Sequence, residues 1–463
     1  MPELHDLSAA QQLNALRARE ISSRDLTQHY LDRIDRLDAE LGAFVTVVPE
    51  CALEEAARAD EQLARGEWAP LTGLPIGLKD LHPTAGLRTT FGSAALADLV
   101  PADDAWTVGL IRQAGAVVLG KTNAPEFGAT CFTENDVTPR PAVTPYALDR
   151  YSSGSSGGAA TAVAAGLLPV AHGSDGAGST RTPAATCHLV GVKPSRGLVS
   201  PAPATGFFST GIEGPIARTV QDAAVLLDVM AHPAPGDLYG WSPGQSFVSA
   251  IEQQPQRLRV AVWTATGLDG VEPHPESARE VRRTADALTR LGHDVQEIDL
   301  PAPYDDAVRQ AVERWFGIAV ATGVPALVPA DRRDLLTPYT RHLIAVGQAL
   351  SGVEAMTVQT VLARFAGRFL EAMADFDVAL TPATNGPAVK LGHYLSQGVE
   401  SVAELMLTWS CYTPWANLTG SPAVALPSGV QLVGHRQHDA ELLALAAQME
   451  AARCWDDLHP PCW

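Results

Sequence analysis

From residue 71 onward, short apolar runs that end in polar residues alternate with helical patterns, and this alternation constrains the fold most. The strand-like runs "LPIGLKD", "AVVLGKT" and "LPVAHGSD" are separated by the helix-like segments "AWTVGLIRQAG" and "GGAATAVAAGLL". Such alternation is typical of a mixed or parallel sheet covered by helices. The sequence therefore predicts an α/β fold: a single large domain with a central mixed β-sheet covered on both faces by helices. Catalytic groups are expected where strands end and loops begin.

The remaining segments extend this core. Residues 1–70 carry helical patterns around the short strand "AFVTVV", which predicts an N-terminal helical segment packed on the core. Residues 71–463 form the main domain. Within it, residues 233–300 are expected as a peripheral lobe, introduced by the Pro/Gly-rich "HPAPGDLYGWSPG" and containing a strand, a helix and a second strand. No long linker divides the chain, so one continuous domain is expected.

Charge and composition exclude several classes of function. The net charge of −19 argues against nucleic acid or an anionic membrane as a partner, because phosphate binding needs clustered Lys and Arg. No apolar stretch is long enough to span a membrane, and the first residues lack a secretory pattern. The six cysteines contain no CxxC pair, which favours free thiols in the cytosol over disulfides or a zinc site. A cytoplasmic protein with no metal and no cofactor is expected.

The segment "YSSGSSGGAATAVAAG" at residues 151–166 raises a choice between a flexible linker and a buried turn. Between Ser152 and Thr180 the only charged residue is Asp175, which is too few charges for a surface linker. A second cluster of small residues, "GSDGAGSTR" at 173–181, follows after one predicted helix and one predicted strand. We therefore expect two serine-bearing turns that converge in space.

Two other interpretations of these turns stay open. A GxSxG match through Ser156 would make the chain an α/β-hydrolase-type esterase, but a buried strand should precede that motif, and the polar "TPYALDRYSS" does so instead. His172 and His188 flank the second cluster as candidate general bases, although such histidines are more often structural.

Lysine is the alternative base. Only four of the 33 Lys and Arg residues are lysine, and Lys79 stands at the end of an apolar strand. Burial there disfavours the ammonium form and lowers the pKa of the amine toward that of a usable base. An ordinary ion pair with the neighbouring Asp80 is the competing interpretation.

Together these segments resemble the amidase signature family. The resemblance rests on "SGSSGGAATAVAAGLLPVAHGSDGAGSTRTPAATCHLVGVKPSRG" at 153–197, on "LTGLPIGLKDLHPTAGLRTTFGS" and "VVLGKTNAPEFG" upstream, and on "GPIARTVQDAAVLLDVM" and "PWANLTGSPAVALP" downstream. It covers essentially the whole chain and implies the amidase signature fold.

The resemblance implies a catalytic triad in which Lys79 is the base, Ser155 a proton relay behind a cis peptide bond, and Ser179 the nucleophile. It further implies an oxyanion hole of backbone N–H groups from Gly176, Ala177, Gly178 and Ser179. Asp175 and Arg181 are expected to brace this loop. Ala177 stands where the family often has glycine, and a methyl group is tolerated there only if its φ is negative.

The expected substrate is a small neutral carboxamide, hydrolysed at its C–N bond. The residues expected at the substrate pocket are Gly128, Cys131, Ser153 and Trp409. The aromatic residues that line either the pocket or the core are Phe132, Phe207, Phe208, Trp409 and Trp415.

Two alternatives share the triad: an acyl transferase, and a glutaminase-type subunit that acts within a complex. Ser410 stands where the amidotransferase members of the family have an acidic residue, which weakens the second alternative. The expected partners are a small-molecule amide and, where the chain assembles, a second copy in a homodimer.

Overall fold

The computed structural model describes residues 3–203, 210–455 and 458–463. Within them, eleven strands form one mixed sheet in the order β1-β3-β2-β4-β6-β5-β10-β11-β9-β7-β8. The strands are β1 (Phe44–Val47), β2 (Pro75–Lys79), β3 (Val117–Thr122), β4 (Val170–Asp175), β5 (Val190–Lys193), β6 (Ile212–Ala217), β7 (Arg259–Val262), β8 (Asp294–Glu297), β9 (Val378–Pro382), β10 (Ala423–Ala425) and β11 (Val430–Gly434). The predicted α/β fold with a mixed sheet is confirmed.

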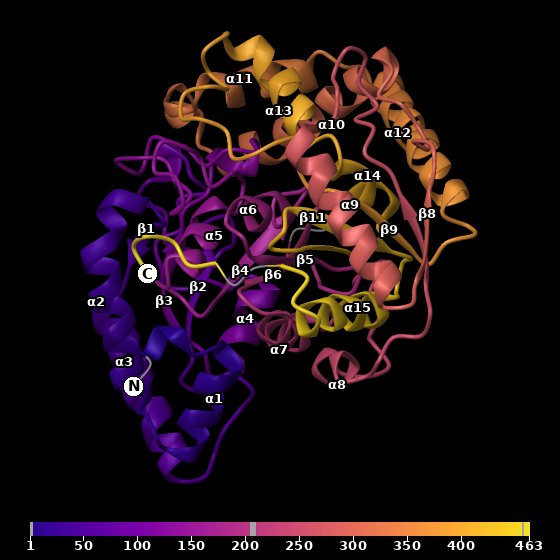
Figure 1. The fold of residues 1–463 in the computed structure, drawn as a ribbon. Coiled ribbons are helices and arrows are strands. Elements are labelled where there is room, and N and C mark those ends of the chain that lie inside the picture. The colour runs from indigo at the N-terminus through magenta and orange to yellow at the C-terminus, as the bar shows by residue number, and fades with distance from the viewer. Residues whose placement is uncertain (1–2, 204–209, 456–457) are drawn as a thin grey trace.

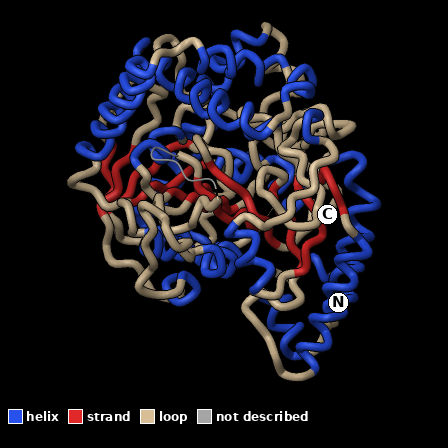
Figure 2. The backbone as a smooth tube through the Cα atoms, turned by 180° about the vertical axis from the view of Figure 1, so that it is seen from behind, coloured by secondary structure: helices blue, strands red, loops and turns tan. Residues whose placement is uncertain are grey.

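Helices cover both faces of this sheet, and Figure 2 shows the strands running across the middle of the molecule between them. The α-helices are α1 (Ala9–Ala18), α2 (Ser23–Leu41), α3 (Pro49–Ala64), α4 (Trp106–Gln113), α5 (Gly157–Ala164), α6 (Arg181–Thr186), α7 (Val220–Met230), α8 (Phe247–Ile251), α9 (Pro275–Arg290), α10 (Asp306–Leu327), α11 (Pro338–Gln348), α12 (Gly352–Ala372), α13 (Val402–Ser410), α14 (Pro414–Thr419) and α15 (Asp439–Ala451). Within the described residues, no helix combines the length and hydropathy needed to cross a bilayer.

The two faces of the sheet bury separate apolar clusters. One cluster joins the strands to α4, α7 and α15, and the other joins them to α2, α3 and α5. Every residue of β2 and β3 is buried. Strands covered on both sides must be apolar throughout, which is why these segments read as continuous apolar runs in the sequence.

Both flanking segments contribute strands to the same sheet (Figure 1). Residues 1–70 supply β1, which pairs antiparallel with β3. Residues 233–300 supply β7 and β8, which extend the sheet beyond β9 as parallel strands. The strands of both segments are therefore joined to the central sheet by main-chain hydrogen bonds.

Candidate active site

Lys79 ends β2, the strand between β3 and β4, and its side chain is fully buried. Its Nζ lies 2.8 Å from Ser155 Oγ and 2.8 Å from Ser156 Oγ. The main-chain oxygen and the Oγ of Ser174 lie 3.1 Å and 3.0 Å from the same nitrogen. Among the described residues, the amine of Lys79 therefore has only hydroxyl and carbonyl oxygens as hydrogen-bond partners.

This environment favours the neutral amine. Burial lowers the pKa of Lys79 to about 7, against the opposing charges of Asp175 and Glu213. Ser156 Oγ also donates to the oxygen of Ser174, so its own hydrogen points away from the lysine. A neutral amine has two N–H groups and one lone pair. Ser156 and Ser174 offer acceptors for the N–H groups, which leaves the lone pair for the hydrogen of Ser155.

The two serine-bearing turns meet at this lysine. The Gly154–Ser155 peptide bond is cis, and α5 begins two residues later. Ser179 lies on the turn between β4 and α6, and its carbonyl oxygen accepts a hydrogen bond from the Ser156 N–H at 3.1 Å. Ser179 lines a cavity of about 460 Å³. Lys79 and Ser155 are hydrogen-bonded directly, and Ser179 is tied to them through the main chain.

A buried ion pair braces the turn that carries Ser179. Arg181 Nε donates to Asp175 Oδ2 at 2.9 Å, and both side chains are inaccessible to solvent. Burial of Asp175 opposes ionisation, but the charge and hydrogen bonds of Arg181 outweigh it and hold the pKa of Asp175 well below its usual range. Asp175 Oδ1 also accepts from the Gly178 N–H at 2.7 Å. The Gly178 N–H is therefore already hydrogen-bonded to Asp175. Ala177 has no positive φ, so its methyl group is tolerated at this position.

Three residues of the C-terminal half complete this brace, and the sequence assigned no role to them. Arg181 Nη2 donates to Asn417 Oδ1 at 2.6 Å, and Nη1 donates to Gln431 Oε1 at 2.8 Å. Thr413 Oγ1 donates to the Ala177 oxygen at 2.6 Å. Asn417 lies in "PWANLTG", which the resemblance covers, so this motif was the only available signal.

The cavity above Ser179 contains some of the residues expected at the pocket. Gly128 and Cys131 line it, together with Ser410 from α13. Within the described residues, Ser153 and Trp409 are not part of the lining. Ser153 Oγ donates to the Cys131 oxygen at 3.0 Å, and Trp409 Nε1 donates to the Pro387 oxygen at 3.0 Å.

The aromatic residues considered for the pocket have other environments. Phe132 stacks on Tyr394 with ring centroids 4.7 Å apart, and Trp415 stacks on Phe369 at 4.9 Å. Phe207 and Phe208 lie outside the described residues.

Acidic side chains outnumber basic ones in the described lining of the cavity. The charged residues there are Asp269, Asp306, Glu313, Glu400, Glu404 and Arg309, and Arg309 is paired with Asp306. This excess of negative charge disfavours an anionic ligand.

Neither histidine near the second turn faces the cavity. His188 Nδ1 lies 2.9 Å from the Pro427 oxygen. His172 lies on the buried strand β4, and its Nε2 is 2.6 Å from Oε2 of Glu213. Both therefore have structural partners in place of a substrate.

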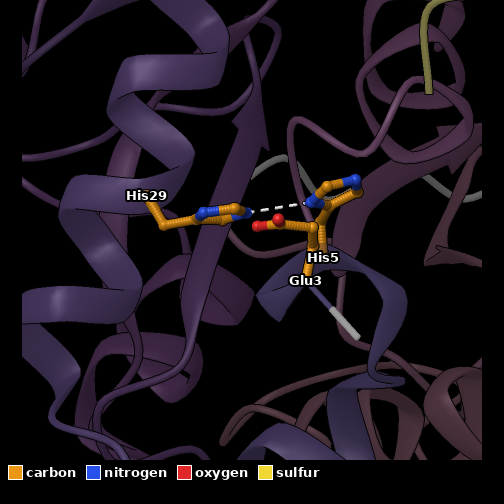
Figure 3. A group of neighbouring side chains, drawn as sticks. All are labelled: Glu3, His5 and His29. Atoms are coloured by element: carbon orange, nitrogen blue, oxygen red, sulfur yellow. Dashed lines mark hydrogen bonds between the residues drawn. The ribbon is translucent and has the colours of Figure 1, made fainter. Parts of the chain in front are cut away.

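In the part of the chain that the structure describes, two groups of side chains have ligand atoms close enough to hold a metal ion: Glu3, His5 and His29 in one, and His82, His172 and Glu213 in the other. In Figure 3, His29 projects from α2 toward His5, and their ring nitrogens are 3.0 Å apart with Glu3 beside them. A contact of that length is a hydrogen bond between imidazoles. None of Lys79, Ser155 and Ser179 belongs to either group.

Comparison with known proteins identifies the family. A family model described as Amidase matches residues 25–443. The putative amidase AmiB2 of Mycobacterium tuberculosis (strain ATCC 25618 / H37Rv) is 38% identical over 466 residues, covering 98% of this chain and 97% of the relative. A glutamyl-tRNA(Gln) amidotransferase subunit of Desulforapulum autotrophicum is 35% identical over 498 residues, covering 98% of both chains.

Solved structures agree. A 6-aminohexanoate cyclic dimer hydrolase superposes with a TM-score of 0.90 at 29% identity, covering 100% of both chains. A bacterial aryl acylamidase of the amidase signature family gives a TM-score of 0.88 at 27% identity, covering 97% of this chain and 96% of the other. The chain therefore belongs to the amidase signature family, whose enzymes act on amides.

Proposed function

We propose that this protein hydrolyses the C–N bond of a small neutral carboxamide through an acyl-enzyme on Ser179. The observation that carries the proposal is the 2.8 Å contact between the buried amine of Lys79 and Ser155 Oγ, beside a cavity that Ser179 lines. Neutral Lys79 takes the proton of Ser155, and Ser155 takes that of Ser179, whose oxygen attacks the amide carbon.

The developing oxyanion needs N–H donors at the turn after β4. Because the Gly178 N–H is bonded to Asp175, the donors are assigned to Gly176, Ala177 and Ser179. One such donor contributes roughly 10²–10³ in rate. Ser155 then passes its proton to the departing amine. The ammonium of Lys79 then returns its proton to Ser155, so that Lys79 is neutral again. Water next attacks the ester of Ser179 while Ser155 takes a proton from the water and passes its own to Lys79. When the intermediate collapses, Ser155 gives a proton to the departing oxygen of Ser179 and regains one from Lys79, which releases the acid and restores the triad.

The excess of acidic side chains around the cavity supports a neutral substrate. Butyramide and succinamate have similar lengths and differ by one carboxylate. We expect kcat/KM to be at least about tenfold higher for butyramide, because one unit of charge repulsion at short range costs roughly 1–4 kcal/mol. Equal values for the two amides would contradict the assignment of a neutral substrate.

The decisive experiment is release of ammonia or amine from a panel of carboxamides, with mass spectrometry of the trapped acyl-enzyme. Ser179→Ala should abolish turnover and trapping. Ser428→Ala, whose Oγ has no partner among the described residues and lies outside the cavity, is the matched control. Full turnover by Ser179→Ala would refute the proposal, and loss only in Ser156→Ala would support an esterase-type site.

An acyl transferase shares every residue of this mechanism, so product partition distinguishes the two. Adding hydroxylamine diverts the acyl group of a transferase to the hydroxamate at the expense of the acid. The 35% identity to a glutamyl-tRNA(Gln) amidotransferase chain motivates one further arm, with glutamine as substrate. Glutamine turnover far above that of butyramide would favour the glutaminase-type alternative.

A further inference from the structure

A buried network of ionisable side chains lies beside Lys79, and the proposed mechanism does not use it. Glu213, on β6, lies 2.6 Å from His172 Nε2 through Oε2 and 3.2 Å from His82 Nδ1 through Oε1. His172 is fully buried and Glu213 is nearly so. Burying a charged group is costly unless it is fully hydrogen-bonded, so this network carries a free-energy cost that its contacts must offset.

The hydrogen bonds fix where the protons of this network lie. The Lys79 main-chain N–H donates to His172 Nδ1 at 3.4 Å. Because a main-chain N–H can only donate, His172 Nδ1 is the acceptor and its Nε2 carries the hydrogen that Glu213 accepts. With its proton on Nε2, His172 has no lone pair there for a metal ion. Glu213 thus fixes the orientation of the His172 ring, and this ring in turn accepts the hydrogen bond of the Lys79 main-chain N–H.

The sheet connects Glu213 to the other end of the lysine. Glu213 pairs with Ser174 in the antiparallel register of β4 and β6, and Ser174 supplies two of the oxygens around Lys79 Nζ. His172 precedes Ser174 by two residues and so shares its face of the strand. Lys121 Nζ donates to the His82 oxygen at 2.6 Å and anchors the third member. Both the main chain and the amine of Lys79 thus contact residues arranged around Glu213.

Electrostatics support this arrangement. Burial opposes ionisation of Glu213, but the charge of His82 and the hydrogen bonds from His172 and His82 outweigh it and hold the pKa of Glu213 below its usual range. Burial lowers the pKa of His172 to about 4, so this imidazole is neutral near pH 7. The negative charge of Glu213 raises the pKa of Lys79, in opposition to burial.

We propose that Glu213 is a positioning residue for Lys79: through His172 it orients the end of β2, and its fixed charge sets the pH range in which the amine accepts a proton. This rests on the proposed role of Lys79 as the base. Within the described residues, the other ionisable groups at the ends of β2 and of the strands beside it are Asp80, His82, Lys121 on β3, and His172 and Asp175 on β4; of these, Asp175 is the one whose charge acts on the amine of Lys79.

The test is Glu213→Gln, which keeps the volume and removes the charge. The new amide oxygen still accepts from His172 Nε2. Its NH₂ group donates to His82 Nδ1, so the proton of His82 moves to Nε2, which is buried and has no partner within the described chain. We expect kcat to fall about tenfold to a hundredfold, as for other residues that orient a functional group. The pH midpoint of kcat/KM should move down by about one unit, because a charge that favours the ammonium form is lost.

Asp222→Asn is the matched control. Asp222 is also a buried carboxylate, but it accepts from the Ala10 N–H at 2.9 Å on α1 and does not act on Lys79. It should lower the thermal unfolding midpoint and leave the pH midpoint unchanged. The labelling rate of Ser179 by a fluorophosphonate, measured against pH, gives a second readout that needs no substrate turnover.

The outcomes separate the two proposals. Activity in Lys79→Met would refute the proposed function itself. An inactive Lys79→Met together with a wild-type pH midpoint in Glu213→Gln would refute only the positioning role, even if that variant were less stable. Calorimetric binding of one equivalent of zinc by the wild type, lost in Glu213→Gln, would overturn it in favour of a metal site.

Discussion

Adding one methyl group at Gly178 tests how the turn that carries Ser179, the proposed nucleophile, is held. Gly178 has φ of +131°, and a Cβ there would lie 2.3 Å from Thr413 Oγ1 and 2.8 Å from Thr413 Cβ. Thr413 Oγ1 holds the Ala177 oxygen at 2.6 Å, so moving Thr413 away breaks a bond that supports the proposed oxyanion donors. Backbone strain costs roughly 1–3 kcal/mol and overpacking a similar amount.

For Gly178→Ala we therefore expect about 2–4 kcal/mol less stability in urea unfolding and a fall in kcat of about 10²–10³. KM should change little, because the donors act on charge that develops in the transition state. Gly176→Ala is the comparison in the same turn: it keeps the main-chain N–H assigned to the oxyanion, and a Cβ there meets nothing within 4 Å. Wild-type kcat in Gly178→Ala, or an equal loss in Gly176→Ala, would refute the reasoning.

Three further predictions concern the triad and its brace. Burial lowers the pKa of Lys79 to about 7, and only the deprotonated amine accepts a proton, so kcat/KM should rise with pH through about 7 in steady-state assays; a flat profile there would exclude this lysine as the base. Asp175→Asn leaves Arg181 as an unpaired buried charge, and urea unfolding should show a loss of about 3–5 kcal/mol, whereas an unchanged midpoint would contradict the brace. Ser155→Ala should lower kcat by about 10²–10⁴ as a proton relay is lost, and Ser156→Ala by less than about tenfold; the reverse order in single-turnover kinetics would exchange their roles.

Local sequence patterns were sufficient to predict the central strands and the lysine at the end of one of them. β2, β3 and β4 are buried on both faces, so their apolar runs are continuous and end abruptly at polar residues. The two serine-bearing turns were recognisable because small residues with almost no charge adjoin buried segments. The direct contact of Lys79 with Ser155 joins positions 76 residues apart, and only the family resemblance pointed to it.

Contacts that depend on the order of the strands in the sheet could not be predicted from the sequence. Gln431 reaches Arg181 across 250 positions because β5, β10 and β11 are neighbours in the sheet. Glu213 meets His172 because β6 lies against β4, and nothing near either residue indicates that pairing. The sequence of residues 233–300 likewise does not indicate that β7 and β8 join the sheet through β9, because β9 lies in a distant part of the chain.

The distribution of lysines has a consequence for acyl chemistry. Lys79, Lys121 and Lys193 are at most 1% exposed, which leaves Lys390 as the one lysine that the described surface presents to solvent. Almost all the positive charge outside is guanidinium, which does not form amides with activated acyl groups near neutral pH. The acyl-enzyme proposed on Ser179 would thus meet very few amines on the protein itself. The same scarcity makes Lys390, which is not part of the cavity lining, a natural single point for attaching the protein to a support.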